Sequence, residues 1–199
     1  RLGFRLIDGL QAKMSDLNIR AELGMPDRLT RFLIDGTIQL GLLYMPQLRP
    51  GLAVEELMEE ELVLVASWPN PTMDMGGRYV FVDWGPEFVN AHAAALPELT
   101  NPGTTFALGA MVAEYIVNRE AAAYLPARYV KKYLDSGQLH LVRDAPSFPY
   151  PVWAVWREDL DPKIRDAAKE VLRHVGDAAE QAGDEVVGVL RNLNNDNQL

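Results

Sequence analysis

The stretch RFLIDGTIQLGLLYMPQLRPGLAVEELMEEELVLVAS, residues 31–67, decides the fold that the sequence predicts. It opens with the end of an amphipathic helix, and Gly36 stands where helices commonly end. The next run, residues 38–44, is almost wholly apolar, which is typical of strands in parallel sheets covered by helices on both faces. Two more strand-like runs, residues 52–57 and 61–67, follow a proline turn. This order of parts predicts an α/β protein.

The segments before this stretch predict two further strands. Residues 2–7 form a short apolar run, and Asp8 is placed to cap a helical turn after it. Residues 17–23 alternate apolar and polar side chains, as in a half-buried strand. With the helix before Gly36 and the strand at residues 38–44, this makes a strand–helix–strand unit whose crossover should be right-handed.

Two proline-rich segments, NPTMDMGGR and APSFPYP, flank a self-contained alternation of strands and helices. After the second segment come a strand, VWAVWRE, and a long amphipathic helix that Asp161 and Pro162 begin. We therefore expect two lobes. One comprises residues 1–66 and 154–199, and the other comprises residues 67–153.

The composition is that of an ordinary globular protein, and it argues against several classes of protein. There are 19 Lys and Arg residues against 28 Asp and Glu residues, and the net charge of −9 makes DNA binding by this chain alone unfavourable. The absence of cysteine excludes disulfides and thiol catalysis. No apolar run has the length of about 18 residues that a membrane helix needs, and no secretion signal is visible. We expect a cytoplasmic protein without a membrane partner.

Four segments together resemble one known family. LTRFLIDGTIQLGLLY, PGLAVEELMEEELVLVAS, YLPARYVKKYLDSGQLHLV and YPVWAVWREDLDPKIRDAAKEVL resemble, in the right order, segments of LysR-type transcriptional regulators over about residues 1–175. The resemblance implies their effector-binding domain, a two-lobed α/β fold similar to type 2 periplasmic binding proteins. It also implies a small-molecule effector, a homodimer or tetramer, and DNA binding only through an N-terminal helix-turn-helix domain that these residues do not contain.

Three departures from the family pattern stand out. Gln39 replaces the family's usual aspartate near the start of the apolar strand. Alanines at Ala121, Ala122 and Ala123 replace a glycine-rich segment, and their Cβ atoms keep a ligand farther from the backbone. The first helix is shorter than usual and lacks the family's proline, and this affects the dimer contacts that the resemblance implies.

Ligands of open parallel sheets bind beyond the carboxyl ends of the strands, where helix N-termini offer free N–H groups. Several expected strand ends and helix starts meet this description. Arg5 has a second interpretation as a partner of a surface carboxylate, Tyr44 and Trp84 as core aromatics, and Gly109 as a plain helix start. The candidate ligand-binding residues are Arg5, Ile7, Asp8, Tyr44, Asp83, Trp84, Gly85, Leu108, Gly109, Ala110 and Tyr124.

Arg5 and Trp84 suggest the chemistry of the ligand. Arg5 follows an expected strand of the first lobe and Trp84 an expected strand of the second, so a cleft between the lobes would join a cation to an aromatic face. A small anionic or aromatic molecule fits this pair, because its carboxylate can accept paired hydrogen bonds from a guanidinium. The helix start at Gly109 would add N–H donors.

Catalytic, metal and cofactor chemistry have little support. The three histidines lie far apart in the sequence, and no serine elbow or phosphate loop is present. The acidic run at residues 55–61 is interpreted as a solvated face. We expect no enzyme activity, no cofactor and no metal. The alternatives are a solute-binding protein of a transport system with the same bilobal fold, and an enzyme similar to porphobilinogen deaminase or prephenate dehydratase, for which no nucleophile or acid–base pair is visible.

Overall fold

The computed structural model describes residues 2–195, so Arg1 and residues 196–199, the ends of the first expected lobe, lie outside the described residues. Contacts divide the chain into two compact units. Unit 1 comprises Arg1–Glu59 and Pro151–Glu180, and unit 2 comprises Glu60–Tyr150 and Gln181–Leu199. Relative to the expected lobes, unit 2 also includes the strand that begins at residue 61 and the last part of the final helix.

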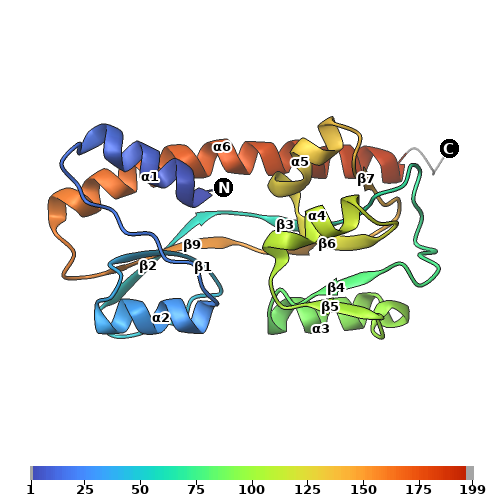
Figure 1. Cartoon of the computed structure of the whole chain (residues 1–199), viewed down its shortest axis with the longest axis horizontal. Coiled ribbons are helices and arrows are strands. Elements are labelled where there is room, and N and C mark those ends of the chain that lie inside the picture. Colours follow the sequence, from blue (N-terminus) through green and yellow to red (C-terminus); the bar gives the residue numbers. More distant parts are fainter. Residues whose placement is uncertain (1, 196–199) are drawn as a thin grey trace. The chain divides into compact units, whose positions relative to one another are not determined.

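Unit 1 contains a three-stranded sheet (Figure 1). Its strands are β1 (Leu40–Tyr44), β2 (Leu52–Met58) and β9 (Val152–Arg157), and β9 lies in the centre. Both pairings are antiparallel, with Leu42 opposite Ala154 and Val54 opposite Val155. The strand at residues 38–44 is thus confirmed, but its predicted parallel pairing is wrong, and β1 alternates buried and half-buried side chains.

Helices cover both faces of this sheet (Figure 1). Helix α2 (Pro26–Asp35) packs Leu33 against Leu43 and Val155 on one face. On the other face, α1 (Leu2–Lys13) and the first part of α6 (Pro162–Asn195) share a cluster that includes Leu6 and Leu172.

Two strand predictions near the N-terminus are wrong. Residues 2–7 belong to helix α1, whose buried side chains are Leu2, Leu6 and Leu10, a spacing of four that places them on one helical face. Residues 17–23 form no strand, and their side chains are exposed or half-buried. Since α1 replaces the first strand, the predicted right-handed strand–helix–strand crossover is absent from the described residues.

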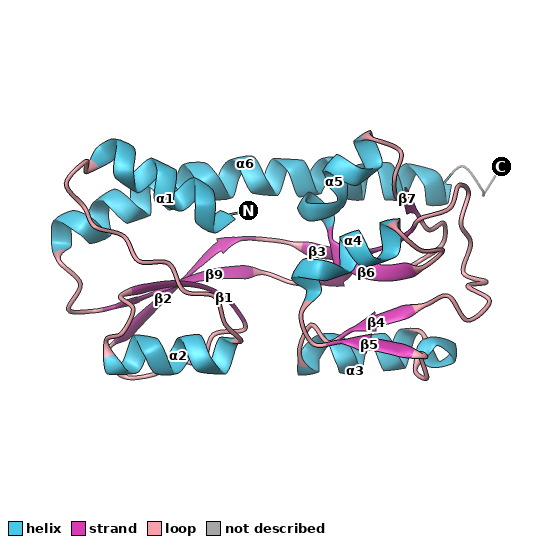
Figure 2. Cartoon of the chain, viewed as in Figure 1, coloured by secondary structure: helices cyan, strands magenta, loops and turns pink. Residues whose placement is uncertain are grey.

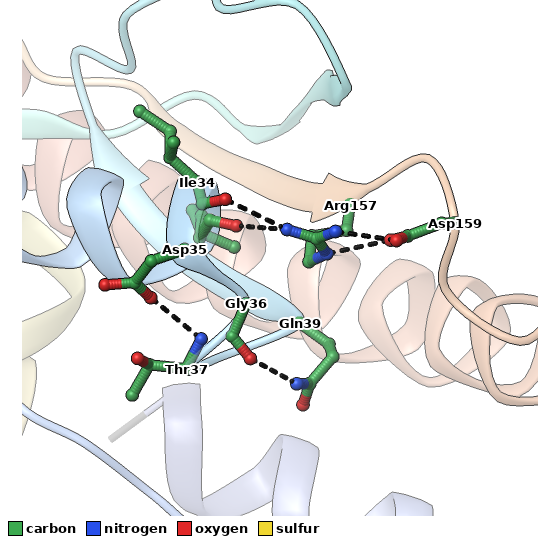
Figure 3. Close-up of polar contacts among 8 residues, drawn as sticks. Ile34, Asp35, Gly36, Thr37, Gln39, Arg157 and Asp159 are labelled. Carbon is green, nitrogen blue, oxygen red and sulfur yellow. Dashed lines mark hydrogen bonds and ion pairs between the residues drawn. The ribbon is translucent and has the colours of Figure 1, made fainter.

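The C-terminus of α2 is held by a residue from β9 (Figure 3). Gly36 adopts a left-handed conformation with φ of 81°, as the sequence predicts for a glycine that ends a helix. Nη1 of Arg157 donates hydrogen bonds to the carbonyl oxygens of Leu33 and Ile34, at 3.0 and 3.1 Å. These carbonyls belong to the last turn of α2, where a cation is favoured by the helix dipole.

Unit 2 is built on two strands that are buried along nearly their whole length. Strand β3 (Glu61–Ala66) pairs antiparallel with β6 (Ala122–Pro126), β7 (His140–Leu141) and β8 (Phe148–Pro149). Val63, Val65 and Leu125 are fully buried in the core of this unit.

The remaining elements of unit 2 surround this sheet (Figure 2). A second, parallel pair consists of β4 (Val80–Val82) and β5 (Thr104–Phe106). The helices are α3 (Pro86–Ala95), the short 3-10 turns η1 (Pro97–Leu99) and η2 (Gly109–Met111), α4 (Val112–Val117), α5 (Ala127–Asp135) and the last part of α6. The predicted order of strands and helices between residues 79 and 141 is confirmed.

Candidate functional site

The strand β4 ends at the three candidate residues 83–85, directly before helix α3. Oδ1 of Asp83 accepts a hydrogen bond from the N–H of Gly85 at 2.9 Å, which closes a tight turn. Gly85 has a φ of 103°, a value that L side chains rarely adopt, and it is the N-cap residue of α3. The strand end thus turns into a helix start within three residues.

The indole of Trp84 is fixed by contacts within unit 2. Its Nε1 donates a hydrogen bond to the carbonyl oxygen of Tyr124 at 2.9 Å. Its ring packs directly on Gly109, where a Cβ atom would lie 1.9 Å from Cη2 of Trp84. The ring also meets Tyr150 edge to face, with centroids 5.2 Å apart. Trp84 remains half-buried, so part of its ring lies at the surface of unit 2.

Tyr124 supports this site from the core rather than from its surface. Its side chain is fully buried, and its hydroxyl donates to the carbonyl oxygen of Pro146 at 2.9 Å. It packs in an aromatic cluster with Phe88, His92 and Phe148. Burial raises the pKa of the Tyr124 hydroxyl. Tyr124 therefore positions Trp84 through its backbone.

The candidate residues 108–110 lie where β5 leads into η2 and α4. Gly109 is buried beneath Trp84, whereas the Leu108 side chain is 54 % exposed. The carbonyl oxygen of Ala110 accepts a hydrogen bond from the Tyr129 hydroxyl at 3.2 Å. The structure therefore brings three candidate residues together, because Gly109 and the backbone of Tyr124 both contact the indole ring of Trp84.

Groups of opposite charge lie at the start of α3. Helix α3 has no side-chain cap, and its first turn begins with Pro86, so the N–H groups of Glu87 and Phe88 are the donors at its N-terminus. These N–H groups favour an acceptor or an anion. The exposed carboxylates of Asp83 and Glu87 lie in the same segment and repel an anion.

Four candidate residues lie in unit 1. Arg5, Ile7 and Asp8 belong to helix α1, and Arg5 and Asp8 are exposed. These three residues were candidates because a strand was expected to end there, and the structure has no strand at that place. Tyr44 does end a strand, β1, where it pairs with Val152.

Glu60 is not on a solvated acidic face, as the acidic run in the sequence predicted. The side chain of Glu60 is fully buried, and its carboxylate forms an ion pair with the guanidinium of Arg128. Glu60 lies between β2 and β3, outside both strands, so no strand period in the sequence marks it as buried.

Two features of the described residues bear on other functions. Within residues 2–195, no group of three or more His, Cys, Asp or Glu side chains is arranged to hold a metal ion. Within the same residues, no helix is long and apolar enough to span a membrane.

Comparison with known proteins identifies the family. The family model described as "LysR substrate binding domain" matches residues 4–176. A curated relative, the HTH-type transcriptional regulator HdfR of Escherichia coli O17:K52:H18, is 27 % identical over 94 residues, which are 46 % of this chain and 33 % of that protein. The chain thus matches about a third of the length of this relative.

Solved structures share the fold at low sequence identity. The bromide-bound regulatory domain of HypT from Salmonella typhimurium has a TM-score of 0.71 and 15 % identity, covering 89 % of this chain and 91 % of that chain. The regulatory domain of MetR, a LysR family regulator from N. meningitidis, has a TM-score of 0.67 and 17 % identity, covering 89 % and 90 %.

These matches confirm the predicted α/β fold of the type 2 periplasmic-binding-protein class. They also favour the regulator interpretation over a transport receptor. Domains of this family are non-enzymatic, bind small-molecule effectors and form oligomers. The chain therefore belongs to the LysR substrate-binding domain family, and it is an effector-sensing regulatory domain.

Proposed function

We propose that this domain recognises a small molecule with a planar apolar body at the edge of unit 2 formed by residues 83–85 and 108–110. The observation that carries the proposal is the half-buried indole of Trp84, held against Gly109 at the uncapped start of α3. Stacking on a preorganised aromatic ring contributes about 0.5–1.5 kcal/mol beyond the area that it buries.

The polar groups beside Trp84 define the rest of the effector. The N–H groups of Glu87 and Phe88 suit a carboxylate or another acceptor, because a helix N-terminus carries partial positive charge. The carboxylate of Asp83 suits a donor or an amine. We propose an aromatic acid or an aromatic amino acid, and the amino acid satisfies both kinds of group.

The same proposal covers the biological setting. The domain transmits effector binding to a DNA-binding domain that these residues do not include, and it works in the cytoplasm as a homodimer or tetramer without a membrane partner. We propose no catalytic turnover, since the described residues offer no metal cluster and the site offers no nucleophile beside a base. Effector binding then acts only by shifting a conformational equilibrium.

The test is calorimetry with aromatic acids, aromatic amino acids and matched aliphatic compounds. Trp84→Ala should weaken the binding of an aromatic ligand by about tenfold or more, a loss that corresponds to about 1.4 kcal/mol. Gly109→Ala should weaken it as well, because the new Cβ displaces the indole. Trp68→Ala is the matched control, since Trp68 is also half-buried in unit 2 but packs on Arg78.

A ligand that binds Trp84→Ala and Trp68→Ala equally well contradicts this site. Equal affinity for aromatic and aliphatic acids contradicts the planar effector.

A further inference from the structure

Unit 2 contains a groove bounded by α5, β7 and the last part of α6 (Figure 1). Its volume is about 750 Å³, within the range of about 300–1,000 Å³ that is usual for small-molecule sites. None of the candidate ligand-binding residues lines it. The family model ends at residue 176, so the α6 residues of this groove lie beyond the matched domain.

Much of the groove is lined by apolar side chains. Val186, Val189 and Leu193 follow one another on α6 at spacings of three and four, so they lie on one face of the helix. Leu134 of α5 and Leu139 before β7 also line the groove. The Val189 side chain is 52 % exposed, so the groove leaves apolar surface in contact with water. An apolar ligand that covers this surface gains free energy from its burial.

The ammonium of Lys131 lies at the groove but is already paired. It lies 3.0 Å from the Asp135 carboxylate and 3.3 Å from that of Glu185 on α6. All three side chains line the groove. A ligand would therefore not find a free cation at Lys131.

Arg143 supplies a free cation. Within residues 2–195, its guanidinium forms no ion pair and no hydrogen bond, although it lines the groove. Its backbone N–H donates to the carbonyl oxygen of Pro71 at 3.4 Å, and the N–H of Asp144 donates to Oδ1 of Asn194 at 2.9 Å. Asp144 has a φ of 61°, which few residues other than glycine adopt. These contacts hold the segment that carries Arg143 against the end of α6.

The paired charges and the free cation lie at different points along α6. Asn194 follows Glu185 by nine positions, which is about 13 Å along the helix axis. The apolar face of α6 lies between these two points. His140 also lines the groove, and its imidazole has no hydrogen-bond partner in the described part of the chain.

We propose that this groove binds a medium-chain aliphatic carboxylate, with its carboxylate at Arg143 and its alkyl chain along Val186, Val189 and Leu193. A guanidinium can donate two parallel hydrogen bonds to one carboxylate. The alkyl chain then covers the apolar face that α6 leaves open to water. An aliphatic chain has no ring to stack on Trp84, so this site is separate from that of the proposed effector.

The test is a titration of the chain with hexanoate, octanoate and decanoate, followed through the methyl resonances of valine and leucine by NMR. The resonances of Val186, Val189 and Leu193 should shift. Affinity should rise by about threefold for each added CH₂, because each methylene that enters the groove is removed from water. Octan-1-ol should bind about fivefold more weakly than octanoate, because it lacks the charge that pairs with Arg143.

Two substitutions probe the two ends of the ligand. Arg143→Gln should weaken octanoate by about fivefold and remove its advantage over octan-1-ol. Val189→Asn should weaken both compounds, and it should fold because Val189 is 52 % exposed. Arg191→Gln and Met111→Asn are the matched controls, a cation and an exposed apolar side chain of unit 2 that do not line the groove.

Equal affinity for octanoate and octan-1-ol overturns the proposal, as does octanoate binding that is unchanged in Arg143→Gln. The proposal is also overturned if decanoate does not bind while Val189→Asn lowers the oligomer mass in sedimentation, because a second copy of the chain then covers the groove. Failure of the aromatic effector to bind at Trp84 leaves this result untouched.

Discussion

Nη1 of Arg157 donates a hydrogen bond to the carbonyl oxygen of Leu33, although 124 positions separate the two residues in the chain (Figure 3). The same guanidinium reaches both carboxylate oxygens of Asp159 through Nε and Nη2, at 2.8 and 2.6 Å. Asp159 thereby orients Arg157 toward the end of α2. One side chain of β9 thus fixes the C-terminus of a helix that packs on the same sheet.

Replacing Arg157 with methionine should lower the urea concentration at the unfolding midpoint, because two carbonyl oxygens at the end of α2 lose a charged donor. Urea denaturation provides the measurement. Asp159→Asn should lower the midpoint by less, since the Asp159 side chain is 67 % exposed and the ion pair is screened by water. An equal loss for both substitutions would contradict the capping role of Arg157.

Two glycines of α6 should respond in opposite directions to substitution by alanine. A Cβ on Gly176 would lie 2.8 Å from the carbonyl oxygen of Leu57, so Gly176→Ala should destabilise by about 1–3 kcal/mol through overpacking. A Cβ on Gly188 meets nothing within 4 Å, so Gly188→Ala should stabilise by about 0.5–1 kcal/mol through helix propensity. Thermal denaturation of both variants is the measurement. A Gly176→Ala variant as stable as the unsubstituted chain would refute the close packing of α6 on Leu57.

His92 should make the fold less stable in acid. It is 1 % exposed and bonded to the Tyr79 hydroxyl at 2.8 Å. Burial lowers its pKa from the ordinary value of 6.5, partly opposed by Glu98. The unfolded chain therefore takes up the proton first, and the contribution of neutral His92 is complete above pH 6.5 and is lost as the pH falls below it.

The measurement for His92 is the free energy of unfolding of His92→Gln relative to the unsubstituted chain, from pH 5 to 8. The variant should be less stable at pH 8, and the deficit should shrink toward pH 5. His174→Gln, at an exposed histidine, is the control substitution. A deficit independent of pH would show that His92 does not titrate in this range.

The isolated chain should not bind duplex DNA measurably at physiological salt. Its net charge of −9 opposes the approach of phosphates, and phosphate contacts dominate affinity for DNA. A gel shift with random duplex DNA tests this expectation, and salt-sensitive micromolar binding would contradict it.

Local patterns predicted much of the fold. The helix that ends at Gly36 and the apolar strand after it occur as α2 and β1, because a helical period followed by glycine is a local signal. The long amphipathic helix after Asp161 occurs as α6. The strand predicted at residues 2–7 was wrong because the apolar period of four becomes clear only when the window reaches Leu10.

Pairing and tertiary contacts could not be predicted in the same way. An apolar run such as β1 does not reveal whether its partner is parallel or antiparallel, since the partner, β9, is more than a hundred residues away. Trp84 was predicted from the strand end that precedes it, but its packing on Gly109 depends on backbone contacts that no local pattern records. The binding role of Arg5 and of the other candidate residues stays a prediction.

Helix α6 contributes to the hydrophobic cores of both units, with Val175 in one cluster and Val186 in the other. Eleven residues separate these two valines, which is close to three helical turns, so both lie on nearly the same side of the helix. A single inserted or deleted residue between them would rotate every later side chain by about 100° and move Val186 and Leu190 out of the core. The stretch of α6 between Val175 and Val186 should therefore tolerate substitutions but not insertions or deletions. Surface loops elsewhere in the chain should tolerate both.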